Sequence, residues 1–180
     1  MKIADLEFEP FIDADSIQKR IAALAQQINT DYAGRTPIFI GVLNGSFMFI
    51  ADLMKHISLP CEMTFTKLAS YYGGLSSSRN IREDVELHID IAGRDIIIIE
   101  DIIDTGNTLS YLVNKLKSYG PASVRVCSLL LKPEALEISI EELTYIGFEI
   151  ENEFVVGYGL DYKELGRNLN AIYRLVSSYH

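Results

Sequence analysis

The sequence DIIIIEDII, residues Asp95–Ile103, and the DTGNT that follows it, residues Asp104–Thr108, decide the fold. The run of β-branched residues is typical of a central strand, and its lack of alternation indicates a parallel sheet covered on both faces. The DTGNT segment combines glycine with helix-capping residues, so it predicts a turn into a helix. Apolar residues then recur at helical spacing, at Leu109, Leu112, Val113 and Leu116.

Strand and helix patterns continue on both sides of this unit. An amphipathic helix is predicted from the apolar spacing of Ile17–Ile28, with Asp13 among the residues that could cap it. Three further strands are predicted at Pro37–Leu43, Cys61–Leu68 and Ser123–Leu131. This alternation predicts an α/β fold with a doubly wound, mostly parallel sheet, whose ligands bind at the carboxyl ends of the strands.

The composition fits a single domain over residues 1–180. The chain is 48% hydrophobic and 23% charged, and a chain of this length can form a core without disulfides. Its net charge of −9 repels nucleic-acid phosphates, so no nucleic-acid partner is expected. The apolar run Ile96–Ile103 is too short to span a bilayer, and the N-terminus lacks a signal-peptide pattern. We therefore expect a cytoplasmic protein without a membrane anchor.

A segment of different character covers residues 69–84. It contains two adjacent tyrosines, two glycines, three consecutive serines at 76–78 and two arginines, with few residues to bury. Long loops of this kind inside compact domains tend to be lids or binding loops, which predicts a mobile lid. The tip of an ordinary β-hairpin explains the same composition equally well.

Three carboxylates lie beside the DTGNT turn. Glu100 and Asp101 interrupt the apolar strand, where buried carboxylates are costly without a partner, and Asp104 follows the strand directly. Oxygen ligands of this kind suit a hard cation or sugar hydroxyls. The amides and hydroxyls of residues 105–108, at the start of a helix, suit a phosphate. A helix cap alone would explain the turn but not the acidic pair, so a binding site is favoured.

Residues 97–109 closely resemble the binding signature for phosphoribosyl pyrophosphate (PRPP) in type I phosphoribosyltransferases. Four other segments narrow the resemblance to the hypoxanthine-guanine phosphoribosyltransferases, in order and spacing: VLNGSFM at 42–48, ASYYG at 69–73, LLKP at 130–133, and FVVGYGLDY at 154–162 with Arg167. The similarity extends over nearly the whole chain. It implies a purine-salvage enzyme that transfers the 5-phosphoribosyl group of PRPP to N9 of hypoxanthine or guanine, giving IMP or GMP and pyrophosphate.

The resemblance also implies a role for particular residues. The PRPP side, including its 5-phosphate, would be bound by Glu100, Asp101, Asp104, Thr105, Gly106, Asn107 and Thr108. Asp104 would be the general base that takes the proton from purine N7. The purine would lie against Lys132, Phe154, Val155 and Asp161. Pyrophosphate would be bound by Asn44, Gly45 and Arg167. Magnesium would be held by Glu100, Asp101 and Asp161.

The family resemblance further implies a small hood, formed by the N-terminal and C-terminal segments, and a lid that contains Ser70 and Tyr71. It also suggests a homodimer or homotetramer. Without the resemblance, a strand-end residue such as Lys132 would be expected on the exposed surface, and Phe154 would be expected in the core.

The chain departs from the family at Asn44, where the family usually has lysine in a Leu-Lys-Gly turn. Asparagine keeps hydrogen bonding but not charge. By resemblance, a cis peptide bond is expected between Leu43 and Asn44. Two alternatives stay open: the same fold with a preference for xanthine or adenine, or a regulatory protein that senses PRPP. The charge of −9 and the presence of Asp104 and Lys132 argue against the second.

Overall fold

The computed structural model describes residues 1–71, 80–85 and 87–176. Its main element is a six-stranded sheet in the order β5-β4-β3-β6-β7-β8. All neighbouring strands are parallel except β4 and β5, which are antiparallel. The strands are β3 (Ile38–Leu43), β4 (Glu62–Tyr71), β5 (Asn80–Val85), β6 (Asp95–Ile103), β7 (Ser123–Leu131) and β8 (Leu143–Glu149).

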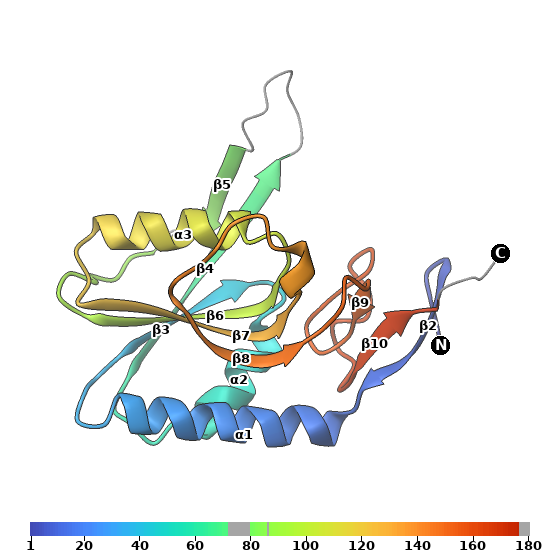
Figure 1. Ribbon diagram of the computed structural model, residues 1–180, viewed down its shortest axis with the longest axis horizontal. Helices are drawn as coiled ribbons and strands as arrows, with labels where there is room; N and C mark the ends of the chain where they lie inside the picture. The colour runs from blue at the N-terminus through green and yellow to red at the C-terminus, as the bar shows by residue number, and fades with distance from the viewer. Residues whose placement is uncertain (72–79, 86, 177–180) are drawn as a thin grey trace.

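Helices cover both faces of this sheet (Figure 1). α1 (Ala14–Asp31) and α2 (Phe47–Lys55) lie on one face, and α3 (Asn107–Ser118) lies on the other. Each face has its own buried apolar cluster, one packed with α1 and α2 and the other with α3. A short 3-10 helix, Pro133–Ala135, follows β7. This confirms the predicted α/β fold with a doubly wound, mostly parallel sheet.

The central elements agree closely with the sequence prediction. β6 occupies the predicted residues 95–103, and β7 occupies 123–131. α1 begins after Asp13, whose carboxylate accepts a hydrogen bond from the amide of Ser16 at 2.7 Å. The four apolar residues predicted to face the core from α3 are all buried. Strong apolar periodicity therefore predicted these elements well, because burial against the sheet dominates their stability.

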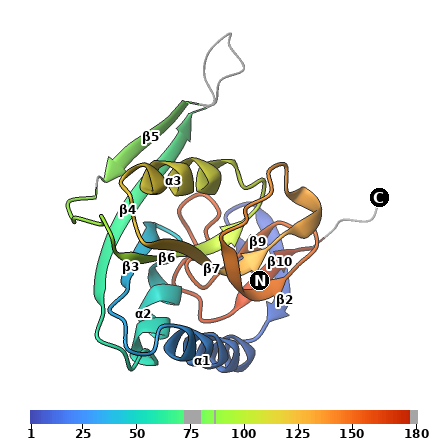
Figure 2. The same cartoon turned by 60° about the vertical axis from the view of Figure 1, so that its left-hand side comes forward.

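A second, four-stranded antiparallel sheet is built from the two ends of the chain. Its order is β1-β2-β10-β9, with strands β1 (Lys2–Ile3), β2 (Leu6–Ile12), β9 (Val155–Val156) and β10 (Ile172–Leu175). It lies beside the main sheet, toward the ends of the strands β6, β7 and β8 (Figures 1 and 2). This sheet and the loop 157–171 between β9 and β10 are called the hood below, since they occupy the segments for which the resemblance implied one.

The segment predicted as a lid loop over residues 69–84 is partly a β-hairpin. β4 continues to Tyr71, and β5 begins at Asn80 and pairs with it antiparallel. At these two ends the lid-loop interpretation is wrong and the alternative of a β-hairpin agrees with the structure. An edge strand such as β5 tolerates polar residues and keeps its backbone hydrogen bonds. Residues 72–79, and the side chains of Ser70 and Tyr71, lie outside the described structure. The predicted lid is therefore in a part of the chain that the structure does not describe.

Candidate active site

The ends of β6 and β7 bring a carboxylate and an ammonium group together. The two strands are parallel and pair Ile103 with Leu131, so the next residues, Asp104 and Lys132, are neighbours. The Lys132 amide donates to the carbonyl of Ile103 at 3.0 Å, and its Nζ donates to Asp104 Oδ2 at 3.2 Å. Lys132 is only 7% exposed, which contradicts the surface position expected from sequence position alone. The carboxylate of Asp104 is 52% exposed and faces solvent.

The turn after β6 has the form of an anion site at a helix start. Gly106 is the N-cap of α3 and has a φ of 82°, in the left-handed region. The N-cap position, which Asp, Thr or Asn would ordinarily occupy, is thus held by glycine. Asp104 contacts Lys132 instead. The turn lines a cavity of about 130 Å³ together with Glu100. Amide groups at a helix N-terminus favour a negatively charged occupant.

Side chains behind the turn fix its shape. Asn107 Nδ2 donates to Thr105 Oγ1 at 2.9 Å and to Glu137 Oε2 at 2.7 Å. The Glu137 amide donates to the carbonyl of Thr105 at 3.0 Å. Sequence reasoning missed Glu137, because the segment that follows the 3-10 helix has no periodic pattern to place it near α3.

The acidic pair, Glu100 and Asp101, lies in β6 near the carboxyl edge of the main sheet. Glu100 is 8% exposed, and burial followed by repulsion from Asp101 raises the pKa of its carboxyl well above the usual range. Burial also raises the pKa of Asp101, although the amide of Ile102, which donates to Asp101 Oδ1 at 2.7 Å, and the charge of Arg167 act in the opposite direction. Glu100 is buried and Asp101 is half-buried, so protonation or a bound cation relieves the repulsion between their carboxylates.

The predicted metal ligands are not all gathered at one point. Among the residues that the structure describes, no three acidic, histidine or cysteine side chains come together as a preformed metal site. Glu100 and Asp101 are adjacent, but Asp161 accepts at Oδ1 from Arg167 Nη2 at 2.8 Å. The other oxygen of Asp161 accepts from the amide of Glu164 at 2.9 Å. Asp161 is thus paired with the arginine predicted to bind pyrophosphate.

The turn between β3 and α2 lies directly against the acidic pair. The peptide bond between Leu43 and Asn44 is cis, as the resemblance implied. Gly45 is buried, and an added Cβ there would collide with the carboxylate of Asp101. Ser46 Oγ donates to the carbonyl of Val42 at 2.6 Å and closes the turn. Asn44 is exposed beside it.

The hood supplies an aromatic surface. Phe154 is 43% exposed rather than buried in the core, and its ring lies edge-on to Tyr162 at 5.6 Å and near Phe8 at 6.1 Å between centroids. Val155 is buried in β9 and pairs with Arg174 of β10. An exposed aromatic face beside a fixed backbone suits a flat, polar-edged ligand. Sequence reasoning missed Phe8 and Tyr162, which hold the ring in place.

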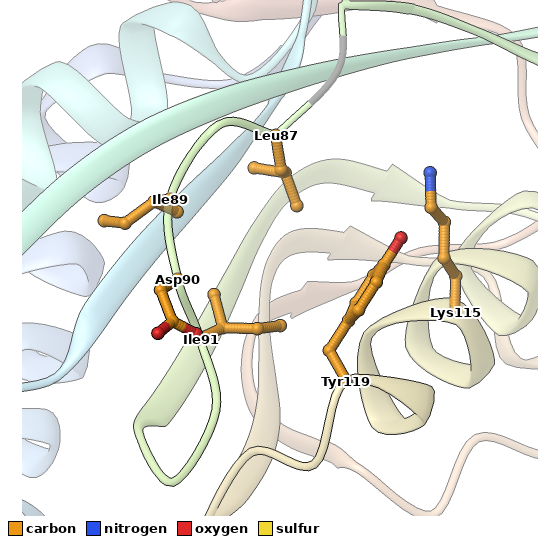
Figure 3. Close-up of a pocket in the computed structure, with 6 residues that line it drawn as sticks. All are labelled: Leu87, Ile89, Asp90, Ile91, Lys115 and Tyr119. Carbon is orange, nitrogen blue, oxygen red and sulfur yellow. The ribbon is translucent and has the colours of Figure 1, made fainter.

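A separate pocket of about 310 Å³ lies away from these groups (Figure 3). It is lined by Leu87, Ile89, Asp90, Ile91, Lys115 and Tyr119, none of which was predicted as a site residue. The segment before β6 and the end of α3 form its walls, and the Gly93 amide donates to the carbonyl of Gly120 at 2.8 Å beneath it. It is therefore near the amino end of β6, whereas the predicted site residues are at the carboxyl ends.

Comparison with known proteins identifies the family. The model of the phosphoribosyl transferase domain family matches residues 13–163. A hypoxanthine-guanine phosphoribosyltransferase of Streptococcus pneumoniae is 48% identical over 160 residues, covering 88% of this chain and 87% of that protein. One from Mycobacterium bovis is 44% identical over 167 residues, covering 89% and 82%. The chain belongs to the hypoxanthine-guanine phosphoribosyltransferase family.

Solved structures of hypoxanthine-guanine phosphoribosyltransferases have the same fold. A Bacillus anthracis enzyme of this name superposes with a TM-score of 0.88 at 35% identity, covering 96% of this chain and 100% of that one. A Staphylococcus aureus hypoxanthine phosphoribosyltransferase also gives 0.88, at 39% identity, covering 96% and 92%. These relatives bear out the family resemblance and the type I phosphoribosyltransferase fold, and neither is named for xanthine, adenine or a regulatory role.

Proposed function

We propose that this phosphoribosyltransferase joins hypoxanthine or guanine to the 5-phosphoribosyl group of PRPP, releasing pyrophosphate. The single observation that carries the proposal is the pair formed by Asp104 and Lys132, 3.2 Å apart at adjacent strand ends, in a chain of this family. An acid and a cation at this spacing can contact neighbouring atoms of one purine ring. The turn proposed to bind phosphate directly follows β6, so both substrates can bind at the carboxyl edge of the main sheet.

Asp104 is the general base in this proposal. Its exposed carboxylate accepts the proton from purine N7 as N9 forms the new bond to ribose C1, and a carboxylate within hydrogen-bond reach of the proton is suited to this. Lys132 donates to purine O6, and its contact with Asp104 orients both groups. Phe154 stacks on the base, and the backbone of Val155, with Asp161 nearby, contacts the edge that carries position 2.

The PRPP side is formed by the turn after β6. Residues 104–108 bind the 5-phosphate at the start of α3, and the acidic pair contacts the ribose hydroxyls. Glu100 and Asp101 also fit a magnesium ion, since two adjacent carboxylates with raised pKa values are stabilised by a hard cation. Magnesium is commonly bound by one or two carboxylates together with substrate phosphates. When bound, the ion supplies charge neutralisation for the leaving pyrophosphate.

Arg167 and the Asn44–Gly45 turn bind pyrophosphate. The guanidinium fork of Arg167 is suited to two phosphate oxygens. Arg167 is paired with Asp161, so PRPP binding would exchange that partner for phosphate, and Asp161 would be one of the residues that hold the metal. The exposed amide side chain of Asn44 adds hydrogen bonding but no charge.

Catalysis in this scheme depends on positioning more than on covalent chemistry. Breaking the bond from ribose C1 to pyrophosphate builds oxocarbenium-like charge, so positioning of the substrates and neutralisation of the leaving group supply the rate. Water must be excluded from C1, and the segment with Ser70 and Tyr71 acts as the lid that does so. The enzyme acts in the cytoplasm as a homodimer or homotetramer, without a nucleic-acid or membrane partner. Within the described residues, no helix is both long and apolar enough to cross a bilayer.

The test is direct measurement of nucleotide formation. The protein is incubated with PRPP, magnesium and hypoxanthine, guanine, xanthine or adenine in turn, and the product is followed by absorbance. The expected result is IMP and GMP formation with kcat/KM well above that for the other two bases. A higher value for xanthine or adenine would assign a different specificity. PRPP binding without any nucleotide would overturn the enzymatic proposal in favour of a PRPP sensor.

A further inference from the structure

Tyr158 occupies a backbone position that tyrosine rarely takes. Gly157 and Leu160 bond to each other through both backbone groups, at 3.0 and 3.1 Å, and enclose Tyr158 and Gly159 as a two-residue turn. The φ angles of these two residues are 50° and 99°, and such turns usually have Asn, Asp or Gly at the first position. A bulky residue in the left-handed region is strained. Its side chain must therefore form contacts that hold it there.

The Tyr158 side chain reaches across to α1 and α2, the two helices on one face of the main sheet. It is 1% exposed, and its hydroxyl donates to Asp52 Oδ2 of α2 at 2.6 Å. Gln18 of α1 donates to the same carboxylate oxygen at 2.8 Å, and Lys55 donates to the other oxygen at 2.8 Å. Burial opposes ionisation, but these hydrogen bonds together lower the pKa of Asp52. Burial and Asp52 raise the pKa of Tyr158, so the hydroxyl remains a donor.

The other side of the same turn contacts the pyrophosphate elements. An added Cβ at Gly159 would collide with the carbonyl of Gly45, so the two backbones are in direct contact. Gly159 also exchanges two hydrogen bonds with Arg167: its amide donates to the Arg167 carbonyl at 2.9 Å, and Arg167 Nη1 donates to its carbonyl at 2.9 Å. The backbone of this one glycine thus touches both groups to which pyrophosphate binding was assigned.

These contacts join the hood to α2 at two points. The Asn44–Gly45 turn precedes the first residue of α2, where it meets Gly159, and Asp52 lies further along the same helix, where it meets Tyr158. We propose that Tyr158 is a positioning residue, which holds the hood turn against α2 through Asp52 and so sets the spacing between Gly45 and Arg167 for pyrophosphate. This inference rests on the proposed function, because it assigns a support to that same site.

The test compares Tyr158→Phe with wild type by calorimetric titration with magnesium pyrophosphate and by steady-state kinetics. Phenylalanine keeps the ring packing and removes only the hydroxyl. We expect the Kd for magnesium pyrophosphate and the KM for PRPP each to rise about tenfold, which is the effect of losing one hydrogen bond to a charged group. The KM for the purine base should change less than twofold, since Lys132 and Phe154 are placed by other contacts.

Tyr145→Phe is the matched control. Tyr145 is also buried, at 3% exposure, and its hydroxyl also donates to an aspartate, Asp31 Oδ2, at 2.6 Å. That bond joins β8 to the end of α1, away from the hood. Its loss should lower thermal stability without changing pyrophosphate affinity. Equal changes in affinity for Tyr145→Phe and Tyr158→Phe, or none for either, would overturn the proposal.

Two variants of Asp52 test the path of the effect. Asp52→Asn keeps an oxygen that accepts from Tyr158 and should restore most of the affinity that Asp52→Ala loses. Tyr158→Phe combined with Asp52→Ala should be no weaker than the worse single variant, because both act through one bond. Fully additive losses of affinity would contradict a positioning role that acts through the hydrogen bond from Tyr158 to Asp52. If wild type binds magnesium pyrophosphate with this pattern of variants but forms no nucleotide, the proposed function fails while the positioning role stands.

Discussion

The turn after β6 and the hood loop after β9 both contribute proposed ligand-binding groups, but different forces fix them. Asp104 and Lys132 are placed by the register of two long parallel strands, which pair from Asp95 with Ser123 to Ile103 with Leu131. Arg167 and Asp161 are placed by a loop in which Tyr158, Lys163 and Glu164 have positive φ angles and which rests on side-chain contacts. Strand register therefore supports the base and its cation, whereas the groups proposed for pyrophosphate depend on side-chain and turn contacts.

Removing the metal should have the largest effect, and it tests whether both regions depend on one ion. With EDTA in excess over magnesium, we expect nucleotide formation to fall below one hundredth of its rate, because pyrophosphate then departs with its charge uncompensated. Restoring magnesium should restore the rate. Full activity in excess chelator would remove the metal role of Glu100 and Asp101.

Asp104→Asn tests the turn after β6 alone. Asparagine keeps an acceptor for Lys132 but cannot take a proton, so we expect kcat to fall by a factor of about 10² or more, with the thermal midpoint and PRPP affinity close to wild type. Rapid-quench measurement of the chemical step separates this from slow product release. Near-normal turnover would exclude Asp104 as the base.

The pH dependence of magnesium pyrophosphate binding tests the acidic pair between the two regions. Burial raises the folded-state pKa of Glu100, so the empty protein retains a proton where an unfolded chain has lost it. Binding of a cation needs the carboxylate, so affinity should rise with pH through that raised pKa and protons should be released. Calorimetry in buffers of different ionisation enthalpy measures the release. Affinity that stays constant from pH 5 to pH 8 would contradict it.

The raised pKa of Glu100 also determines how this residue affects the free energy of unfolding. Because its folded pKa lies above the unfolded one, its favourable contribution is present below the unfolded pKa and is lost as pH rises through the folded pKa. Glu100→Gln should therefore stabilise the metal-free protein at neutral pH by about 1 kcal/mol, as functional-site replacements often do, while magnesium pyrophosphate binds about tenfold more weakly. Chemical denaturation at pH 5 and pH 8 checks the sign, since the gain should shrink at the lower pH.

Asn44→Lys should have the smallest effect, and it tests how the positive charge that binds pyrophosphate is divided between Arg167 and the turn before α2. Adding a cation at position 44 should tighten magnesium pyrophosphate binding by at most about 1 kcal/mol, because Asn44 is exposed and the charge is screened. Arg167→Ala should weaken it by more, since Arg167 then carries most of the compensating charge. If neither variant changes the Kd in calorimetric titration, position 44 has only a conformational role in the turn.

The two regions also differ in how far sequence predicts them. The isoleucines of 96–99 and the helical spacing from Leu109 predicted β6 and α3, because dense burial leaves a strong pattern. β9 has only two residues and β10 four, which is too short for any periodicity, so only the family resemblance placed the hood.

Other features of the site lacked a local signal as well. The burial of Lys132 depends on Asp104, a residue on another strand end, and the tether from Tyr158 to Asp52 joins residues far apart in the chain. The polar composition of β5 fits a loop and a hairpin strand equally well, so only its pairing with β4 decides between the two. Contacts between distant segments of this kind cannot be derived from hydrophobic periodicity.

The pairing of β2 with β10 has a consequence for the order in which the molecule matures. These strands come from opposite ends of the chain, so the hood closes only when the last strand has left the ribosome. The strands from β3 to β8 and their helices are synthesised earlier, and they hold Asp104, Lys132 and the acidic pair. Long-range pairing of this kind forms slowly. A nascent chain would therefore form the strand ends with Asp104, Lys132 and the acidic pair first, and gain the hood residues Phe154, Val155 and Arg167 last.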